Sequence, residues 1–170
     1  MKNIFIAVIL GIALAGVSFA QSDRSTKPRI AVIEFSDAST TMTAEAKRQL
    51  QSSIAFALVK NREFEVPDVR NTRAATQGGG TAVKIGKLLG VNYVLTGTVT
   101  EYSPNPGGRG QMTVRTQLID VATGKVKLSG DTTAASSGVM TSGAGHAEMS
   151  VKVVKPLIQK LTATLSAAGL

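Results

Sequence analysis

Two neighbouring segments alternate between apolar and polar side chains, and this alternation limits the fold more than any other feature of the chain. Successive side chains of a β-strand point to opposite faces of the sheet, so a two-residue period indicates strands with one buried and one solvent-exposed face. Between the segments, Gly124 suits the left-handed conformation of a tight turn. The sequence therefore predicts an antiparallel hairpin over 111–121 and 125–133. Its inner residues are Met112, Val114, Thr116, Leu118, Val126, Leu128 and Gly130, and its outer residues are Thr113, Arg115, Gln117, Lys127, Ser129 and Asp131.

The rest of the chain supplies the elements that pack against this hairpin. The β-branched run 29–35 is typical of a strand buried on both faces. A longer strand over 91–102 has Gly97 at its middle, where a bulge or a close backbone neighbour is expected. Helices are predicted over 44–60, 81–89 and 147–168, a short edge strand over 64–69, and a polar linker over 70–80. The order β-α-β-α-β-β-β-α indicates an α/β two-layer sandwich with a mixed sheet.

The spacing of apolar residues predicts which sides of the helices face the core. The first helix has an apolar residue every fourth position, and the second has an N-cap threonine and a glycine stop. In the C-terminal helix, Pro156 is expected to cause a kink or to mark the start of the second half. The inward residues are Ala46, Leu50, Ile54, Leu58, Ala82, Ile85, Leu88 and Leu89, whereas Lys47, Arg48, Gln51 and Ser52 are predicted to face water.

The N-terminus has the pattern of a secretory signal peptide. Lys2 provides a positive charge, an apolar run of about 14 residues follows, and Ser18 and Ala20 place small residues before Gln21. The run is shorter than the roughly 20 residues that span a bilayer; the alternative is an uncleaved N-terminal anchor. The sequence predicts a signal peptide over 1–20, a flexible lead-in over 21–28 and one domain over 29–168. It places the protein in the periplasm, with peripheral outer-membrane association and no transmembrane span after cleavage.

Charge and cysteine content exclude several classes of function. The formal net charge of +8 includes Lys2, so +7 remains after signal cleavage. Export argues against a nucleic-acid partner, and the basic residues occur in scattered pairs, which indicates a solvated surface or, alternatively, attraction to anionic lipids or cell-wall polymers. The chain has no cysteine, which excludes disulfides, a thiolate nucleophile, Cys-ligated metals and a lipidated cysteine.

Catalytic and cofactor motifs are missing. His146 is the only histidine, and we expect it to be a capping or exposed residue, because one histidine without cysteine suits neither a zinc site nor a Ser-His-Asp triad. The three glycines at 78–80 precede a helix, but no Gly-Lys-Ser/Thr follows them, so they are interpreted as a hinge rather than a phosphate loop. The sequence predicts a non-enzymatic protein that binds no metal and no cofactor.

Three segments together resemble the CsgG-type curli-secretion family, in the same order along the chain. They are 27–35 (KPRIAVIEF), 81–102 (TAVKIGKLLGVNYVLTGTVTEY) and 118–126 (LIDVATGKV). The resemblance implies a periplasmic α/β domain that acts as an assembly or secretion accessory, with envelope-protein partners or self-assembly into an oligomer, and an involvement in curli-type export. The segments 103–110 and 134–145 are too short for membrane hairpins, so we expect the domain without the pore.

An alternative relative of similar fold is the LpoB-type activator, which docks on a peptidoglycan synthase. These activators are usually lipoproteins with a long tether, whereas the lead-in here is short. A hydrolase is a third alternative, but no catalytic site supports it.

For a binding protein, two surfaces are candidates. The first is the outer face of the hairpin, with Arg115, Gln117, Lys125 and Lys127 as predicted partner-binding residues. The second is the edge near Val66 and Val69, because an uncovered edge strand can recruit another strand. For both surfaces, ordinary solvated surface is the alternative interpretation.

Overall fold

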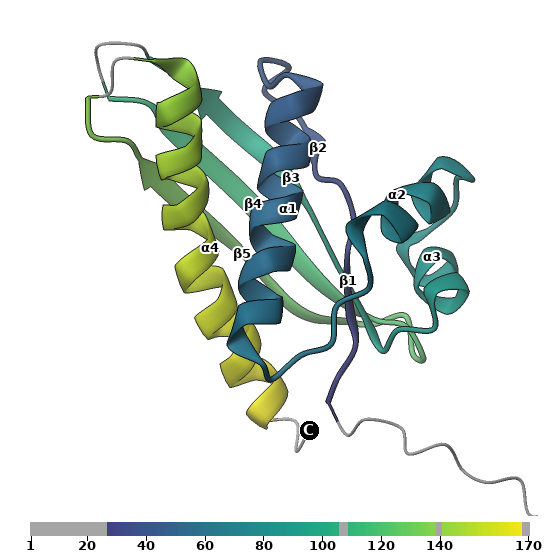
Figure 1. The fold of residues 1–170 in the computed structure, drawn as a ribbon. Coiled ribbons are helices and arrows are strands. Elements are labelled where there is room, and N and C mark those ends of the chain that lie inside the picture. The colour runs from purple at the N-terminus through teal and green to yellow at the C-terminus, as the bar shows by residue number, and fades with distance from the viewer. Residues whose placement is uncertain (1–26, 106–108, 139–140, 168–170) are drawn as a thin grey trace, which may run out of the picture.

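The computed structural model describes residues 27–105, 109–138 and 141–167. The signal peptide, most of the lead-in and the predicted domain end at residue 168 lie outside the described residues. A mixed sheet runs behind two long helices, with two shorter helices at one side (Figure 1). The elements are β1 (Ile30–Val32), β2 (Ser36–Asp37), α1 (Ala44–Asn61), α2 (Val69–Gln77), α3 (Ala82–Leu89), β3 (Tyr93–Ser103), β4 (Gln111–Asp120), β5 (Val126–Ala135) and α4 (Ser142–Ala167).

The sheet combines parallel and antiparallel pairs. Strands β1 and β2 both pair with β3 in parallel, whereas β3–β4 and β4–β5 are antiparallel, which gives the order β1-β3-β4-β5 with β2 beside β3. The parallel connection from β1 to β3 contains three helices, as a crossover of this kind requires a long segment. The predicted α/β class with a mixed sheet and helices is therefore confirmed.

The main core lies between the sheet and the helices α1 and α4. Leu50, Ile54 and Leu58 of α1 and Leu157 and Leu161 of α4 are fully buried there. A second, smaller core lies on the opposite side of the sheet, where α3 packs against one end of β3 and β4: Gly86 approaches Val94 and Val121 so closely that a Cβ on it would lie 2.8 Å and 2.4 Å from their methyl groups. Because β1 contacts both cores, its three residues are all buried, as the β-branched run predicts.

Three predictions about the first half of the chain were wrong. The strand predicted over 64–69 is reduced to a bridge between Arg29 and Glu65. The predicted linker over 70–80 contains α2, which Asp68 caps by accepting a hydrogen bond from the Arg70 amide. Only Thr72 of this helix is buried, so α2 lacks the apolar period by which sequence reveals a helix. Leu88 was expected inside but is 73% exposed, since α3 contacts the second core through Ala82, Gly86 and Leu89.

The hairpin agrees with its alternation except near the turn. In β4 the inner residues are buried and Gly124 has a φ of +70°. The pairing shifts by one residue at Leu118/Ile119, so Val126 pairs with Ile119 instead of pointing inward and is 50% exposed. At Gly97 a Cβ would lie 2.3 Å from the Arg115 carbonyl oxygen and 2.5 Å from the Phe35 ring; the glycine thus marks a close neighbour, and the β-bulge lies further on, between Val99 and Glu101.

Two polar residues are buried against expectation. Gln51 was predicted to face water but is 0% exposed, because its amide donates to the Val32 carbonyl oxygen. His146 was predicted to be exposed or capping, yet it is 2% exposed and lies edge-on to the Tyr102 ring at 5.6 Å. Its Nε2 lies 3.3 Å from the Ser150 hydroxyl, and burial lowers the pKa of the imidazole below its usual 6.5.

Pro156 lies within α4, which continues on both sides of it.

His146 predicts a pH dependence of stability. The unfolded chain takes up a proton near pH 6.5, whereas the folded chain resists it, so stability from the neutral imidazole is present above pH 6.5 and is lost as the pH falls below that value. We expect the free energy of unfolding, measured by denaturant titration, to fall between pH 7.5 and pH 5.5. In His146→Gln this slope should disappear. A carboxylate whose folded pKa is lowered, such as Glu148 at about 2, loses its stabilising contribution only as the pH falls below its unfolded value of 4.5, which lies outside this window. An equal slope in both proteins would contradict the prediction.

Within the described ranges, no helix combines the length and the apolar character that crossing a membrane requires.

Candidate partner-binding face

Within residues 27–105, 109–138 and 141–167, part of one face of the sheet is not covered by any helix. Helices α1 and α4 cover the opposite face, and α3 covers only the end where β3 begins and β4 ends. The uncovered part carries polar side chains because the outer positions of β3, β4 and β5 point away from the core. We call this surface the open face; it consists of Thr98, Thr100, Glu101, Thr113, Arg115, Gln117, Ser129, Asp131 and Thr133.

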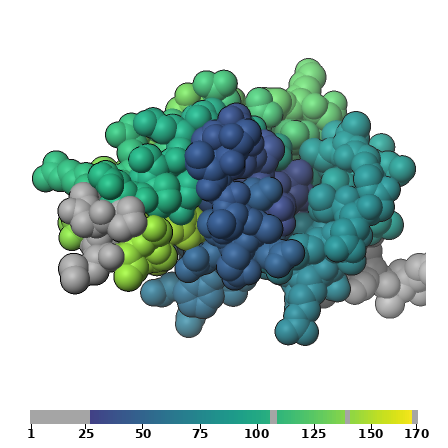
Figure 2. Space-filling model, turned by 90° about the horizontal axis from the view of Figure 1, so that it is seen from above, coloured from purple at the N-terminus to yellow at the C-terminus, as the bar shows by residue number. Residues whose placement is uncertain are grey.

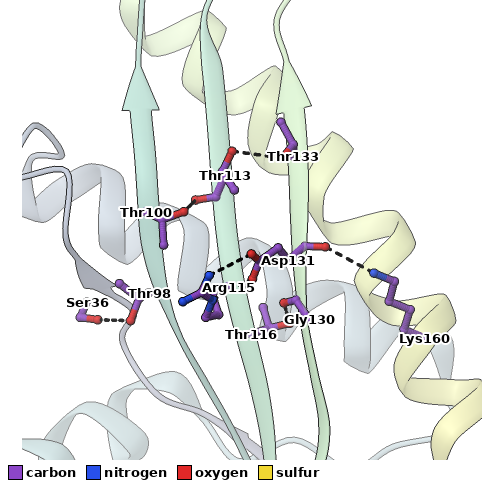
Figure 3. Close-up of polar contacts among 10 residues, drawn as sticks. All are labelled: Ser36, Thr98, Thr100, Thr113, Arg115, Thr116, Gly130, Asp131, Thr133 and Lys160. Atoms are coloured by element: carbon purple, nitrogen blue, oxygen red, sulfur yellow. Dashed lines mark hydrogen bonds and ion pairs between the residues drawn. The ribbon is translucent and has the colours of Figure 1, made fainter.

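An ion pair lies at the centre of the open face. Arg115 of β4 and Asp131 of β5 are directly paired in the sheet, and Figure 3 shows their side chains pointing toward each other. The Arg115 Nε donates to Oδ1 at 2.9 Å and Nη2 donates to Oδ2 at 3.1 Å. This bidentate contact lowers the pKa of Asp131 and raises that of Arg115. Both groups stay charged at neutral pH and lie exposed to solvent, so they are available to a partner.

Hydroxyl groups surround the ion pair. In the same row, Thr98 pairs with Arg115, and its hydroxyl lies 2.7 Å from the Ser36 hydroxyl of β2 (Figure 3). In the next row, the Thr113 and Thr133 hydroxyls lie 3.1 Å apart. The Thr113 hydroxyl also lies 3.2 Å from the Glu101 carboxylate, to which it donates. A surface of hydroxyls with one ion pair and one further carboxylate can donate and accept hydrogen bonds but offers little apolar area. Such a surface fits a polar protein interface rather than a pocket for an apolar ligand.

The four predicted partner-binding residues do not form one cluster. Arg115 and Gln117 lie together on the open face. Lys125 lies beyond β4 in the turn and is exposed, and Lys127 forms a 3.7 Å ion pair with Asp120 at the end of β4. Both lysines lie at the turn end of the hairpin, away from the row of Arg115 and Asp131. The binding role of all four residues remains a prediction.

The second predicted surface does not exist as an edge strand. Val66 and Val69 pack against the main core, and Val69 begins α2. One edge of the sheet is formed by β5, at the end of the strand order opposite to β1. There, two lysines of α4 occupy backbone acceptors: Lys152 donates to the Ala135 carbonyl at 2.8 Å and Lys160 to that of Asp131 at 3.5 Å. Lysines at an edge oppose pairing with another strand.

An apolar hollow between α1 and α4 was not predicted from the sequence. It has a volume of about 590 Å³ and is lined by Phe56, Val151 and Ile158, with Lys60 and Lys155 beside them. Phe56 is 70% exposed and Val151 67%. The sequence did contain an indication of this hollow, because Phe56 is a large apolar residue that lies outside the inward-facing stripe of α1.

The described residues bring together no group of three or more His, Asp or Glu side chains that could hold a metal ion. The three glycines at 78–80, interpreted as a hinge rather than a phosphate loop, lie in the turn between α2 and α3, with Gly79 and Gly80 at positive φ.

Comparisons with known proteins give a family and a fold. The family model described as "Peptidoglycan-synthase activator LpoB" matches residues 37–134. A search of curated proteins finds no match. Among solved structures, the chain is similar to a hypothetical protein from Chlamydia trachomatis, with a TM-score of 0.57 and 12% identity over 83% of this chain and 99% of that one. It is also similar to the PelC dodecamer from Paraburkholderia phytofirmans, with a TM-score of 0.53 and 22% identity over 76% of this chain and 87% of that one.

The NMR structure of LpoB from Escherichia coli is also similar, with a TM-score of 0.50 and 18% identity over 66% of this chain and 60% of that one. At these identities, the structural likenesses show a common fold. The family match contradicts the CsgG-type resemblance: the assignment to curli secretion, and with it the role of secretion accessory, was wrong. The helix-strand unit and the hairpin that suggested it are packing features that proteins of one fold have in common, so they do not separate the two families.

Proposed function

Because this chain belongs to the family of the peptidoglycan-synthase activator LpoB, we propose that it docks on a peptidoglycan synthase in the cell envelope and raises its activity. The observation that carries the proposal is the family match, which spans residues 37–134 and thus more than half of the chain. The secretory pattern of the first 20 residues supports a location outside the cytoplasm. In this role the protein acts by binding and performs no reaction of its own.

We propose the open face as the docking surface. All of its residues lie within the matched segment 37–134, whereas the hollow between α1 and α4 takes half of its lining from α4, which lies beyond that segment. Arginine is enriched among the residues that contribute most to protein interfaces. The Arg115–Asp131 pair therefore provides the charged centre of the proposed interface, and the neighbouring hydroxyls and the Gln117 amide provide hydrogen bonds around it.

The double variant Arg115→Ala/Gln117→Ala tests this proposal. We expect its affinity for a purified peptidoglycan synthase from the same organism to fall tenfold or more, because a docked partner would lose the charged centre and an amide contact. Interferometry measures the affinity, and glycan polymerisation by the synthase measures activation. The fold should persist, since both side chains lie on the outer side of β4.

A matched control is Lys60→Ala, which removes a cation from the helix layer on the other side of the sheet. It should bind and activate as the wild type does. If the double variant activates normally, the open face is not the docking surface. If the wild-type protein neither binds a synthase nor changes its rate, the proposed function itself is contradicted.

A further inference from the structure

A polar cleft lies between α1 and α2, beside the segment that joins β1 to β2. Its volume is about 550 Å³, and its lining includes Lys47 and Arg48 of α1 and Arg73 and Gln77 of α2. Figure 2 shows the dark-blue N-terminal half of α1 next to the teal helices on this side of the molecule. None of the residues that define the open face lines the cleft, although Ser36, which does, contacts Thr98. The proposed function does not require the cleft.

Arg73 is held in this cleft by uncharged groups. Its Nε donates to the Gln51 Oε1 at 2.9 Å, and its Nη2 lies 3.3 Å from the Ser52 hydroxyl and 3.4 Å from the Arg48 carbonyl oxygen. Gln51 is fully buried and is fixed in turn by its 2.8 Å hydrogen bond to Val32. Among the described residues, no carboxylate pairs with Arg73. The guanidinium is therefore fixed in orientation, and no carboxylate within the described residues balances its charge.

The buried glutamine makes this arrangement unlike an ordinary surface arginine. Burial of an amide costs free energy unless both of its polar atoms are bonded, and Gln51 meets that condition only when Arg73 occupies its oxygen. An arginine that only exposes its charge to solvent needs no buried side chain to hold it. Arg70, on the same helix, donates no side-chain hydrogen bond within the described part of the chain. The contacts of Gln51 therefore serve to orient Arg73.

The charges around the cleft are mostly positive. Lys47 and Arg48 lie beside Arg73, and each has only a long ion pair of 3.9 Å, with Glu34 and Glu45 respectively. Glu34 is the one carboxylate that lines the cleft, so three cations face a single anion there. The Gln77 amide adds a neutral donor. An oriented guanidinium with further cations and an amide is the chemistry that recognises an oxyanion.

We propose that the α1–α2 cleft binds a ligand through an oxyanion, a carboxylate or a phosphate, with Arg73 as its principal contact and Gln51 as the residue that positions it. The planar guanidinium matches the oxygen pairs of both groups. Lys47 and Arg48 supply attraction over a longer range, and the charge of Glu34 limits the affinity for a lone small ion.

The test is an NMR titration of the isotope-labelled protein with sodium phosphate and, separately, sodium acetate, at an ionic strength kept constant with sodium chloride. We expect saturable shifts at the amides of residues 47, 73 and 77 and at the Arg73 Nε–H signal, with a dissociation constant of roughly millimolar order for such a small probe. Tighter binding of phosphate points to a phosphate-bearing ligand, and tighter binding of acetate to a carboxylate-bearing one.

Three variants decide the assignment. Arg73→Gln should weaken binding tenfold or more, and Gln51→Met, which keeps the volume but removes the acceptor, should weaken it by a similar factor while Arg73 remains present. Arg70→Gln is the matched control: it removes the same charge from the same helix and should leave binding unchanged. Thermal unfolding checks that each variant is folded.

The proposal is overturned if neither anion gives saturable shifts in the cleft. It is also overturned if Arg70→Gln weakens binding as much as Arg73→Gln does, because binding then reflects diffuse charge. Wild-type binding by folded Gln51→Met would contradict the positioning role.

Discussion

Gly97→Ala is expected to lower the free energy of unfolding by about 3 kcal/mol, toward the upper end of the usual cost of adding a methyl group to a packed core. The new Cβ would lie 2.3 Å from the Arg115 carbonyl oxygen and 2.5 Å from a carbon of the Phe35 ring. Neither neighbour can yield easily, since Arg115 belongs to the central strand β4 and Phe35 is 1% exposed in the main core. Urea denaturation followed by circular dichroism measures the change.

Gly143→Ala is the control for this variant. Gly143 lies in the first turn of α4, and a Cβ there would meet no atom within 4 Å. Its replacement should be neutral or stabilising by up to about 1 kcal/mol, because alanine favours a helix over glycine. A loss of stability equal in the two variants would show that the close approach at Gly97 has no special role.

Leu157→Ala is expected to cost about 2–5 kcal/mol, the range observed when a buried leucine is truncated. Leu157 is 0% exposed and belongs to the main core, where α4 packs against the sheet. The loss combines the transfer free energy of the removed carbons with the cavity that remains, and α4 cannot move to fill that cavity while its other buried residues hold it in place.

Leu88→Ala provides the comparison, since Leu88 is 73% exposed on α3. It should change the free energy of unfolding by less than about 0.5 kcal/mol. Thermal denaturation of both variants at the same pH measures the difference. If the two variants are equally stable, α4 does not hold the sheet in the way the structure describes.

The elements that were predicted correctly are those whose signal is local. Alternation identified β4, because each outer residue of a half-buried strand lies two positions from the next. Thr81 and Gly90 marked the ends of α3, since a capping hydroxyl and a left-handed glycine act within one helical turn. The α/β class followed from the order of such elements.

The elements that were missed depend on contacts between distant segments. Helix α2 carries no apolar period, and one of its contacts is made by Arg73, whose partner Gln51 lies 22 residues earlier. Gln51 in turn is buried because its amide meets the Val32 carbonyl oxygen, a pairing that only the packing of α1 on β1 creates. His146 was misplaced for the same reason, as Tyr102 covers it from β3.

The candidate site shows the same division. The sequence predicted that Arg115 and Gln117 point outward, yet it also included Lys125 and Lys127, which lie at the turn end away from the central row, and it did not predict the register shift between β4 and β5. Asp131 was recognised only as an outward residue, because its pairing with Arg115 depends on that same register.

By itself the sequence determined the α/β class, the inner and outer faces of β4, the ends of α1 and α3, and an N-terminus with the pattern of a secretory signal, since each of these follows from the period or chemistry of adjacent residues. Only the tertiary structure decided that α2 is a helix, that Gln51 and His146 are buried, that Arg115 pairs with Asp131 on an uncovered face, and that a cationic cleft lies between α1 and α2. Each of these depends on which distant residues meet, and that is set by how the helices pack on the sheet and by the register of the strands.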